Sequence, residues 1–334
     1  MPKRYRKAAS FAADIYGFDQ PGTFFAKSHL HSTASIFHFN RSDTQYLCKI
    51  DCAPTAHSYS AMLQRFEYAE FLHKAGIRVL SPLRSPQDKI IECFHLDECD
   101  CMLYAWPMIP GTTLTDIAPD DLKEYYQDWA KLIAGIHWIA KDYPKPPSPL
   151  EASTQDFLNW HQEWSNALDK LSEPALKAVW QELKAELDSY SASESKFGMI
   201  HNDIHPQNML MSDDGLYLID FDRATRHFFV QDIANAIYSE YSRIAYHSSH
   251  KSRLKSLDEL FLKPFINTYL EHYPSLISDL EKIESFILYR RILMYCIFED
   301  ELQLYAPKTK KKLADDIILR TPFLKRSIRE ILKL

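Results

Sequence analysis

The stretch MIHNDIHPQNMLMSDDGLYLIDFDRA, residues 199–224, combines a polar turn with an apolar run that ends in two carboxylates. Its chemistry-bearing side chains are His201, Asp203, His205, Asn208, Asp220 and Asp222. Charged and amide side chains of this density are unusual in a protein core. The stretch therefore predicts a functional loop followed by a short strand.

Three side chains of this stretch suit metal and acid–base chemistry. Asn208 and Asp220 offer oxygen ligands, and Mg²⁺ commonly takes one or two such protein ligands together with substrate phosphates. Asp203 would then remain to orient an acceptor hydroxyl and take its proton. An ordinary hairpin with polar tips explains the turn at 213–215, but it does not explain the polar turn before it.

The bulk composition describes an ordinary globular protein. The chain has 334 residues, 46% of them hydrophobic and 25% charged, with a net charge of −6. Two short basic clusters, within 3–7 and 308–312, are interpreted as solvated ends, so we expect no nucleic-acid partner. No run approaches 18 apolar residues and no signal peptide is visible, so we expect no membrane span and a cytoplasmic protein. The sequence does not indicate the oligomeric state.

Four of the potential metal ligands lie close together in the segment ECFHLDECDC. They are Cys93, His95, Cys99 and Cys101. Their spacing is not that of a Cys-x-x-Cys zinc site. Alternation of side chains on both sides of the polar turn favours a β-hairpin instead.

Composition divides the chain into a strand-rich front and a helix-rich rear. The front has strand-like runs at 35–40, 45–50, 90–96 and 101–106, with one helical stretch at 58–75. The rear has helix patterns at 119–140, 153–171, 174–190, 231–247, 256–272, 277–304 and 312–332. Two prolines and a glycine within 105–111 mark the junction. We predict an α+β protein with an N-terminal nucleotide-binding lobe, 1–107, and a C-terminal catalytic and substrate-binding lobe, 108–334.

The segments HNDIHPQN (201–208) and LIDFD (218–222) resemble the aminoglycoside phosphotransferase and choline kinase superfamily, small-molecule kinases with a protein-kinase-like fold. Asp232-Ile-Ala is similar to a further family segment. The resemblance implies two lobes, a small antiparallel-sheet N-lobe with one helix and a larger, mainly helical C-lobe. It also implies ATP or GTP as the phosphoryl donor and Mg²⁺ as the metal ion. By the resemblance, Asp203 is the catalytic base and His201 supports the loop. Asn208 and Asp220 are the metal ligands.

The family pattern also implies a strand lysine and a helix glutamate. Lys49 lies at the end of QYLCKI and faces inward by alternation. Family spacing favours Glu67 as its partner, whereas helical geometry favours Glu70, and we expect Glu67. Either glutamate could instead be a solvated helix charge.

The rest of the nucleotide site is expected from layout. The chain has no G-x-G-x-x-G motif, so Ser32 and its neighbours in 27–35 are the candidates for covering the phosphates. A polar β-turn is the alternative there. Backbone groups around Trp106 and Met108 are expected to contact the purine.

These features predict a phosphotransferase that moves the γ-phosphate of ATP or GTP to a hydroxyl of a small molecule. Asp222 could bind a second metal or a cationic substrate, or it could form a hydrogen bond to the backbone of its own loop. Acidic and aromatic side chains of the rear favour a cationic acceptor such as an aminoglycoside, choline or an amino alcohol. These side chains are Glu240, Asp300, Glu301, Trp160, Trp164, Tyr238, Tyr241 and Tyr295.

Two other classes of protein remain as alternatives. One is a Ser/Thr protein kinase, which the short segment 223–229 and the lack of an A-P-E motif disfavour, since they leave little room for an activation loop. The other is a nucleotide-binding protein without turnover. The presence of base, lysine and metal ligands disfavours it.

Overall fold

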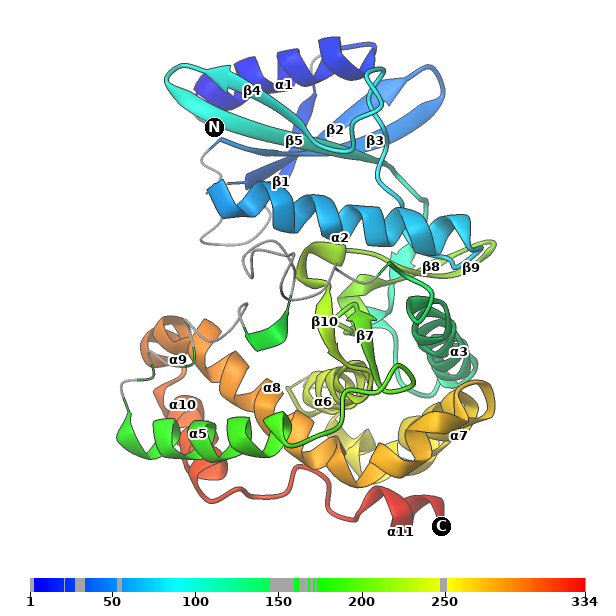
Figure 1. Cartoon of the computed structure of the whole chain (residues 1–334), viewed down its shortest axis with the longest axis vertical. Helices are drawn as coiled ribbons and strands as arrows, with labels where there is room; N and C mark the ends of the chain where they lie inside the picture. Colours follow the sequence, from blue (N-terminus) through cyan, green and yellow to red (C-terminus); the bar gives the residue numbers. More distant parts are fainter. Residues whose placement is uncertain are drawn as a thin grey trace. The chain divides into compact units, whose positions relative to one another are not determined.

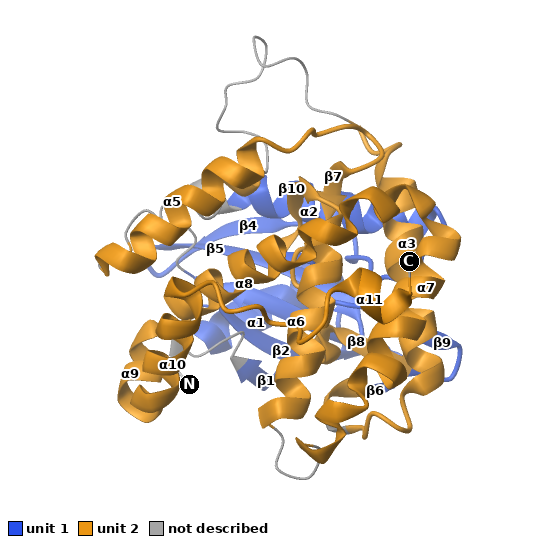
Figure 2. Ribbon diagram, turned by 90° about the horizontal axis from the view of Figure 1, so that it is seen from below, with its two compact units in different colours: residues 1–112, 145–157, 212–222 blue, residues 113–144, 158–211, 223–334 orange. Residues whose placement is uncertain are grey.

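The computed structural model describes residues 3–20, 22–27, 34–52, 56–144, 159–161, 168, 171, 173–246 and 251–333. The described chain divides into two compact units, shown in different colours in Figure 2. The first unit holds residues 1–112 and 212–222, and the second holds 113–144, 158–211 and 223–334. The lobe boundary after residue 107 stays a prediction.

The first unit is built on a five-stranded antiparallel sheet. Its strands are β1 (Thr23–Lys27), β2 (Ala34–Arg41), β3 (Thr44–Asp51), β4 (Glu92–Leu96) and β5 (Cys99–Pro107), in the order β1-β2-β3-β5-β4. The four predicted strands are confirmed, and β1 extends the sheet at one edge. Residues 48–50 of β3 are all buried because both faces of the sheet are covered, so Lys49 is buried on the face opposite to Cys48 and Ile50.

Two helices cover opposite faces of this sheet (Figure 1). The predicted helix is α2 (Ala56–Lys74), and its Phe66 packs against Met102 and Tyr104. The second, α1 (Lys3–Tyr16), was not predicted, because its core-facing residues are mostly alanines next to a basic cluster. Small side chains give a weak hydrophobic signal, yet they allow a helix to pack closely against a sheet. The first unit thus has one helix more than expected.

The predicted hairpin at the cysteines is confirmed. Strands β4 and β5 pair with Cys93 opposite Met102, and the turn residues Asp97 and Glu98 have φ values of 48° and 66°. Such values are typical of a two-residue turn of the I′ type. Cys93 is exposed whereas Cys101 is buried against α1, so the pleat separates these two thiols.

A second strand arrangement brings the end of the decisive stretch into the first unit. Strand β9 (Gly215–Leu218) lies beside residues 77–80, with Leu218 N donating to Arg78 O at 3.0 Å and Leu80 N donating to Leu218 O at 3.2 Å. Gly215 has φ +129°, and a Cβ atom there would lie 3.1 Å from the Arg78 guanidinium carbon. The glycine is therefore required by its backbone conformation, while the flexible Arg78 side chain could move aside. Asp220 and Asp222 follow directly.

The second unit is mainly helical. Its helices are α3 (Lys123–Ala140), α5 (Pro174–Asp188), α6 (Val230–Tyr246), α7 (Lys263–His272), α8 (Ile283–Ile297), α9 (Glu299–Tyr305), α10 (Pro307–Ile318) and α11 (Ile328–Leu332). Helix α3 packs on α7 and α6 packs on α8. A two-stranded antiparallel sheet joins β7 (Phe197–Ile200) to β10 (Thr225–Phe228), and it frames the polar turn. The remaining strands are short: β6 (Thr112–Thr113) and β8 (Met209–Ser212).

Three predicted helices of the rear are divided in the structure, of which 256–272 starts in a π-helix, Asp258–Leu262, and continues as α7. The stretch 277–304 starts in a 3₁₀ helix, Pro274–Lys282, and continues as α8 and α9. The stretch 312–332 contains the end of α10 and then a break, because Arg320 has a left-handed φ of 47° and Pro322 cannot continue the helix. Most of the predicted helix 153–171 lies outside the described residues.

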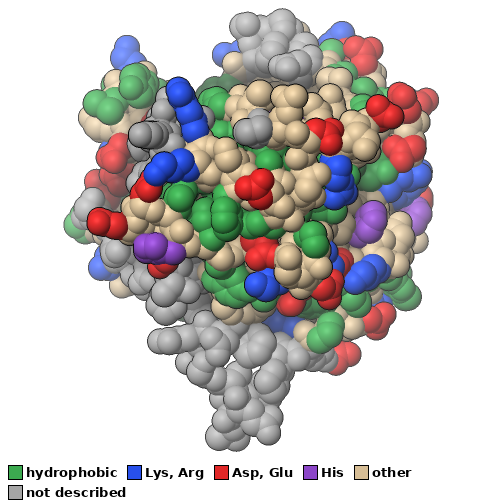
Figure 3. All heavy atoms as spheres, turned by 90° about the horizontal axis from the view of Figure 1, so that it is seen from above, with side chains coloured by type: hydrophobic (Ala, Val, Ile, Leu, Met, Phe, Trp, Pro, Cys, Tyr) green, Lys and Arg blue, Asp and Glu red, His purple; other side chains and the backbone are tan. Residues whose placement is uncertain are grey.

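Among the described helices, none combines the length and the apolar character needed to cross a bilayer. On the face shown in Figure 3, Lys and Arg side chains are interspersed with Asp and Glu, so no field of one sign covers it.

Candidate active site

The backbone of the polar turn is held by one buried carboxylate. Asp232, in the first turn of α6, accepts hydrogen bonds from His201 N at 3.0 Å and from Asn202 N at 2.7 Å. Asp232 is fully buried, so these bonds are not exposed to competing water. The carboxylate thus fixes the two residues that precede Asp203.

Asn202 has a left-handed backbone at φ 64°. Asparagine tolerates this region better than most residues. Its carbonyl accepts a 2.9 Å bond from Asn235 Nδ2, while its own side chain is buried with no hydrogen-bond partner among the described residues. The asparagine that replaces the arginine of the H-R-D motif is therefore explained by backbone conformation.

A buried histidine and tyrosine extend the support of the turn. His137 Nε2 lies 3.2 Å from Asp232 Oδ2, and His137 Nδ1 lies 2.7 Å from the Tyr269 hydroxyl. Sequence analysis missed both residues, because a single histidine in α3 and a tyrosine in α7 give no local signal. His201 was predicted as a loop support, and its Nδ1 accepts a 3.3 Å bond from Asp203 N.

Asp203 presents its carboxylate at the end of this fixed turn. Arg290 Nη2, on α8, donates to Asp203 Oδ1 at 2.7 Å, and His205 Nε2 lies 3.5 Å from Oδ2. Burial acts to raise the pKa of Asp203, but the charge of Arg290 and the contact with His205 outweigh it, so this pKa lies well below its ordinary range. The low pKa keeps the carboxylate ionised. Because the side chain is 24% exposed, a ligand can reach it.

Asn208 is oriented by the same turn. Its Nδ2 donates to the backbone carbonyl of Asp203 at 3.0 Å, in the 3₁₀ helix Pro206–Asn208. Because the amide nitrogen is used in this way, Oδ1 is the atom left to act as a ligand. A carboxamide oxygen suits a hard cation such as Mg²⁺.

In the first unit, Lys49 and Asp222 form an ion pair. Lys49 lies on β3 with its ammonium 6.0 Å from the centre of the Tyr104 ring, and its side chain is 11% exposed. Asp222 reaches it from the 3₁₀ helix Phe221–Arg223. Asp222 was expected to bind a second metal, a cationic substrate or the backbone of its own loop. The ion pair with Lys49 is a fourth role, which the sequence did not indicate.

The glutamates of α2 have other surroundings. Glu70 receives two bonds from Arg84, at 2.6 and 2.9 Å, and lies 2.8 Å from Lys74. Glu67 is exposed, and among the described residues no ion pair joins it to Lys49. The expected Lys49–Glu67 pair is thus absent here because Asp222 holds the ammonium. A role of Glu67 toward a nucleotide stays a prediction.

Asp220 has a left-handed backbone at φ 65°, which turns the chain sharply at the end of β9. The pKa of the Tyr104 hydroxyl is raised well above its usual value, first by burial and then by the negative charges of Asp222, Asp51 and Asp220. Several carboxylates near one buried ring form a negative region that a cation would neutralise. Asp220 therefore offers one oxygen ligand of the kind that Mg²⁺ prefers, and Mg²⁺ needs few protein ligands. In the described residues, no group of three or more His, Cys, Asp and Glu side chains could hold a metal ion.

The remaining nucleotide-site predictions have mixed outcomes. Ser32 lies outside the described residues. Trp106 packs edge-on against Phe66 and Tyr104, and Met108 N donates to Gln45 O at 2.8 Å. The Met108 amide is therefore already bonded within the sheet, and contact of either residue with a purine stays a prediction.

The side chains proposed to attract a cationic acceptor separate into two groups. Glu240 is fully buried, bonded to the Tyr126 hydroxyl and, at 2.6 Å, to Arg243. Its charge is thus used within the fold, which is a correction to the expected role. Trp164 lies outside the described residues, whereas Asp300 and Glu301 lie in the first turn of α9.

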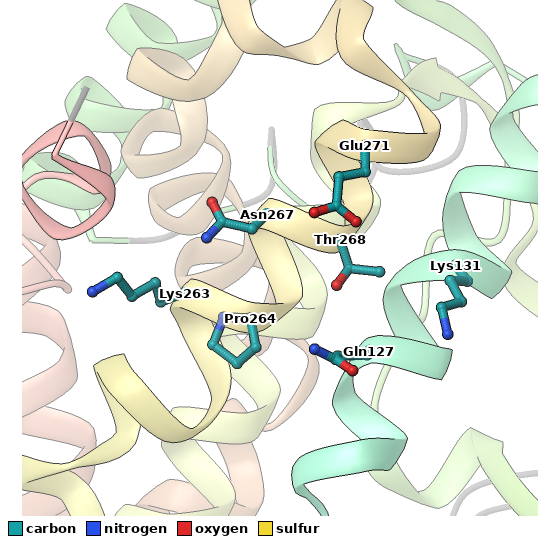
Figure 4. A pocket seen from close by; sticks show the side chains of 7 residues that line it. All are labelled: Gln127, Lys131, Lys263, Pro264, Asn267, Thr268 and Glu271. Atoms are coloured by element: carbon teal, nitrogen blue, oxygen red, sulfur yellow. The ribbon is translucent and has the colours of Figure 1, made fainter.

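A polar hollow in the second unit contains none of the predicted site residues. It lies between α3 and α7, with Gln127 and Lys131 on one side (Figure 4). The α7 side is formed by Lys263, Pro264, Asn267, Thr268 and Glu271.

Comparison with known proteins gives matches over most of the chain. Residues 31–274 match the model of the phosphotransferase enzyme family. The amicoumacin kinase of Bacillus subtilis (strain 168) is 23% identical over 311 residues, which cover 91% of this chain and 88% of that protein.

Solved structures agree in fold. An amicoumacin kinase in complex with AMP-PNP, Ca²⁺ and Ami has a TM-score of 0.81 at 20% identity, covering 97% of this chain and 96% of its own. A microcompartment-associated aminopropanol kinase has a TM-score of 0.65 at 13% identity, covering 94% of each chain. The predicted kinase-like α+β fold and the predicted kinase activity on an alcohol group are thereby confirmed. With a family model matched over well over half of its length, the chain belongs to the phosphotransferase enzyme family.

Proposed function

We propose that this protein transfers the γ-phosphate of ATP to a hydroxyl group of a small, amine-bearing molecule, with Mg²⁺ bound. The observation that supports this most directly is the Asp203 carboxylate, which is ionised, partly exposed and placed on a backbone fixed by Asp232. A carboxylate of this kind can align an acceptor hydroxyl for in-line attack. ATP-dependent chemistry of this type also agrees with a cytoplasmic location.

Asp203 is the proposed catalytic residue. Its carboxylate would accept a hydrogen bond from the acceptor hydroxyl and receive the proton as the oxygen–phosphorus bond forms. Because the transition state of phosphoryl transfer is loose, orientation of the hydroxyl contributes more than early removal of its proton. A low pKa for Asp203 agrees with such an orienting role.

Asn208 and Asp220 are the proposed metal ligands. Asn208 has its amide nitrogen bonded to Asp203 O, which leaves Oδ1 as the ligand atom. When bound, Mg²⁺ neutralises charge that develops on the phosphate oxygens. Lys49 would contact the α- and β-phosphates of the nucleotide after it leaves Asp222. Glu67 is the candidate that would then form an ion pair with the Lys49 ammonium. Trp106 and Met108 would contact the purine.

An amine on the acceptor is favoured by acidic residues that follow α8. Helix α9 has three acidic side chains in its first turn, of which Glu299 is paired with Lys310 at 3.1 Å. Asp300 is exposed and Glu301 is half-buried. They follow the end of α8, the helix that carries Arg290, the partner of Asp203. The name of the similar aminopropanol kinase also specifies an amine-bearing alcohol.

The proposal is tested by measuring nucleotide consumption with a panel of amino alcohols, aminoglycosides and amicoumacin, using ATP and GTP in parallel. Asp203→Asn should lower kcat by about 100- to 10,000-fold while nucleotide affinity changes little. Asp214→Asn, in the exposed turn before β9, is the matched control and should retain activity. Labelling of peptides only would indicate a protein kinase, and nucleotide binding without any turnover would indicate a scaffold.

The amine requirement has its own test. Each active alcohol is compared with an analogue in which the amine is replaced by hydroxyl or hydrogen. Asp300→Asn with Glu301→Gln should raise KM for the amine-bearing acceptor and leave KM for the nucleotide unchanged. Equal activity on the amine-free analogue would refute this part of the proposal.

A further inference from the structure

Helix α8 has two adjacent arginines within a buried, apolar stretch. Arg290 and Arg291 have side chains that are 8% and 7% exposed. Their neighbours Tyr289, Ile292 and Leu293 are almost fully buried. Since adjacent residues of a helix point about 100° apart, the two guanidinium groups have different partners.

Arg291 has a role within the fold. Its Nη1 donates to the carbonyl of Thr321 at 2.8 Å, and its Nη2 lies 3.7 Å from Asp316. These contacts fix the segment that follows α10. Arg290 instead donates to Asp203 Oδ1 at 2.7 Å, across 87 residues of sequence.

The burial of Arg290 is costly for the fold. Removing a guanidinium from water carries a desolvation penalty that one ion pair does not reliably offset. Arg290 Nε is also buried with no hydrogen-bond partner among the described residues. An apolar side chain would satisfy this position of α8 at lower cost, so stability alone does not account for the arginine.

The two oxygens of Asp203 are unequal as a result. Oδ1 has a short, charge-assisted bond to Arg290, whereas His205 Nε2 is 3.5 Å from Oδ2, longer than an ordinary hydrogen bond. Oδ2 is therefore the oxygen with more capacity left to accept a bond from a hydroxyl. The plane of the carboxylate is set by the guanidinium on its other oxygen.

We propose that Arg290 is a positioning residue for phosphoryl transfer: it fixes the Asp203 carboxylate so that Oδ2 faces the acceptor hydroxyl. The inference rests on the proposed role of Asp203. It adds a positioning residue from α8 to the proposed catalytic residue, and it assigns separate tasks to the two oxygens of Asp203.

The test compares matched variants of the two arginines. Arg290→Ala should lower kcat on the order of 10- to 100-fold with little change in either KM, because a small displacement of a positioning group reduces the rate of the aligned reaction. Arg291→Ala should retain kcat per folded molecule even where its melting temperature falls. Guanidinium chloride at low concentration should restore part of the activity of Arg290→Ala and none of any loss in Arg291→Ala. Arg290→Lys should retain more activity than Arg290→Ala.

A second readout does not require turnover. Crystal structures of the two alanine variants should show the Asp203 carboxylate rotated in Arg290→Ala and unchanged in Arg291→Ala. An unmoved carboxylate, or equal losses of kcat in the two variants, would overturn the inference. If the wild-type protein phosphorylates no acceptor, the proposed function fails, while the crystallographic comparison still decides whether Arg290 positions Asp203.

Discussion

The ammonium of Lys49 on β3 is ion-paired with the carboxylate of Asp222, which follows it by 173 residues. Both side chains are largely buried, at 11% and 19% exposure. The strand lysine expected to bind phosphates is thus held by the third residue of the Asp-Phe-Asp segment, not by a helix glutamate. The pair links the sheet of the first unit to the segment after β9.

This pair is expected to contribute measurably to stability. Asp222→Asn removes the carboxylate that is bonded to the buried Lys49 ammonium, so it should lower the free energy of unfolding by about 1.5–3 kcal/mol. Lys49→Met should also destabilise. The double variant should lose less than the sum of the two, with a coupling of about 1 kcal/mol measured by urea unfolding.

An exposed pair of the same unit is the control. Lys7 and Asp97 are 2.7 Å apart, but their side chains are 47% and 46% exposed. Their double-variant cycle should show coupling close to zero, because water screens the attraction. Equal coupling energies in the two cycles would contradict the explanation that burial strengthens the Lys49–Asp222 pair.

Asn202 should be replaceable by glycine but not by alanine. Both changes remove the same buried, unpartnered amide, but only glycine adopts φ 64° without steric cost. Asn202→Gly is expected to keep stability and kcat. Asn202→Ala should lose about 1–2 kcal/mol of stability and also activity, because Asp203 follows directly. Thermal unfolding and turnover measured side by side would reveal the difference, and indistinguishable variants would refute the explanation.

Asp232→Asn should affect both folding and catalysis. In asparagine, an NH₂ group replaces one carboxylate oxygen and would face a backbone N–H, either that of His201 or that of Asn202. One of the two buried hydrogen bonds is then lost, which should lower the free energy of unfolding by about 1–3 kcal/mol. The polar turn should then loosen, which lowers kcat.

Asp279→Asn is the matched control for this change. Asp279 is also a buried aspartate of the second unit, but it is bonded to Lys196 and Lys282. It should lower the melting temperature while leaving kcat per folded molecule unchanged. A comparable fall in kcat for both variants would mean that Asp232 acts through general stability alone.

Glu70 predicts a pH-dependent contribution to stability. Bonds from Arg84, opposed by burial and aided by Lys74, lower the pKa of Glu70 to about 2, compared with about 4.3 in an unfolded chain. A depressed folded-state pKa stabilises the fold above the unfolded pKa, and this stability is lost as pH falls from about 5 toward 2. Wild type should therefore exceed Glu70→Gln by about 1 kcal/mol at pH 7, after allowance for screening, and the gap should narrow by pH 3.5 in urea titrations.

Glu67→Gln should behave in the opposite sense. Although much of the Glu67 side chain is exposed, partial burial of its carboxylate raises the pKa of Glu67, against the attraction of Arg84, so the charged form costs stability above that pKa. The glutamine variant should be at least as stable as wild type at pH 7. A parallel loss in both variants would show that the Arg84 contact does not distinguish the two glutamates.

The local conformation around the candidate site could be predicted because it depends on residues that are close in sequence. The motif at 201–208, the turn at 213–215 and the strand ending before Asp220 are set by neighbours in sequence, so spacing and turn chemistry were sufficient. The same holds for the strands of the first sheet and for the cysteine hairpin, where alternation reports burial directly. Helix α1 was missed because an alanine-rich face becomes a core face only when a sheet lies against it.

Sequence by itself thus determined which residues are the candidates for the chemistry, through the resemblance to a kinase family: Asp203, Asn208, Asp220 and Lys49. Tertiary structure alone decided the partners of the charges, because an ion pair depends on which helix or strand brings a group within about 4 Å. It assigned Arg290 to Asp203 from 87 residues away, Asp222 to Lys49, and Glu240 to Arg243 in the interior. Spacing along the chain carries no information on such pairings, since they arise from packing between distant elements.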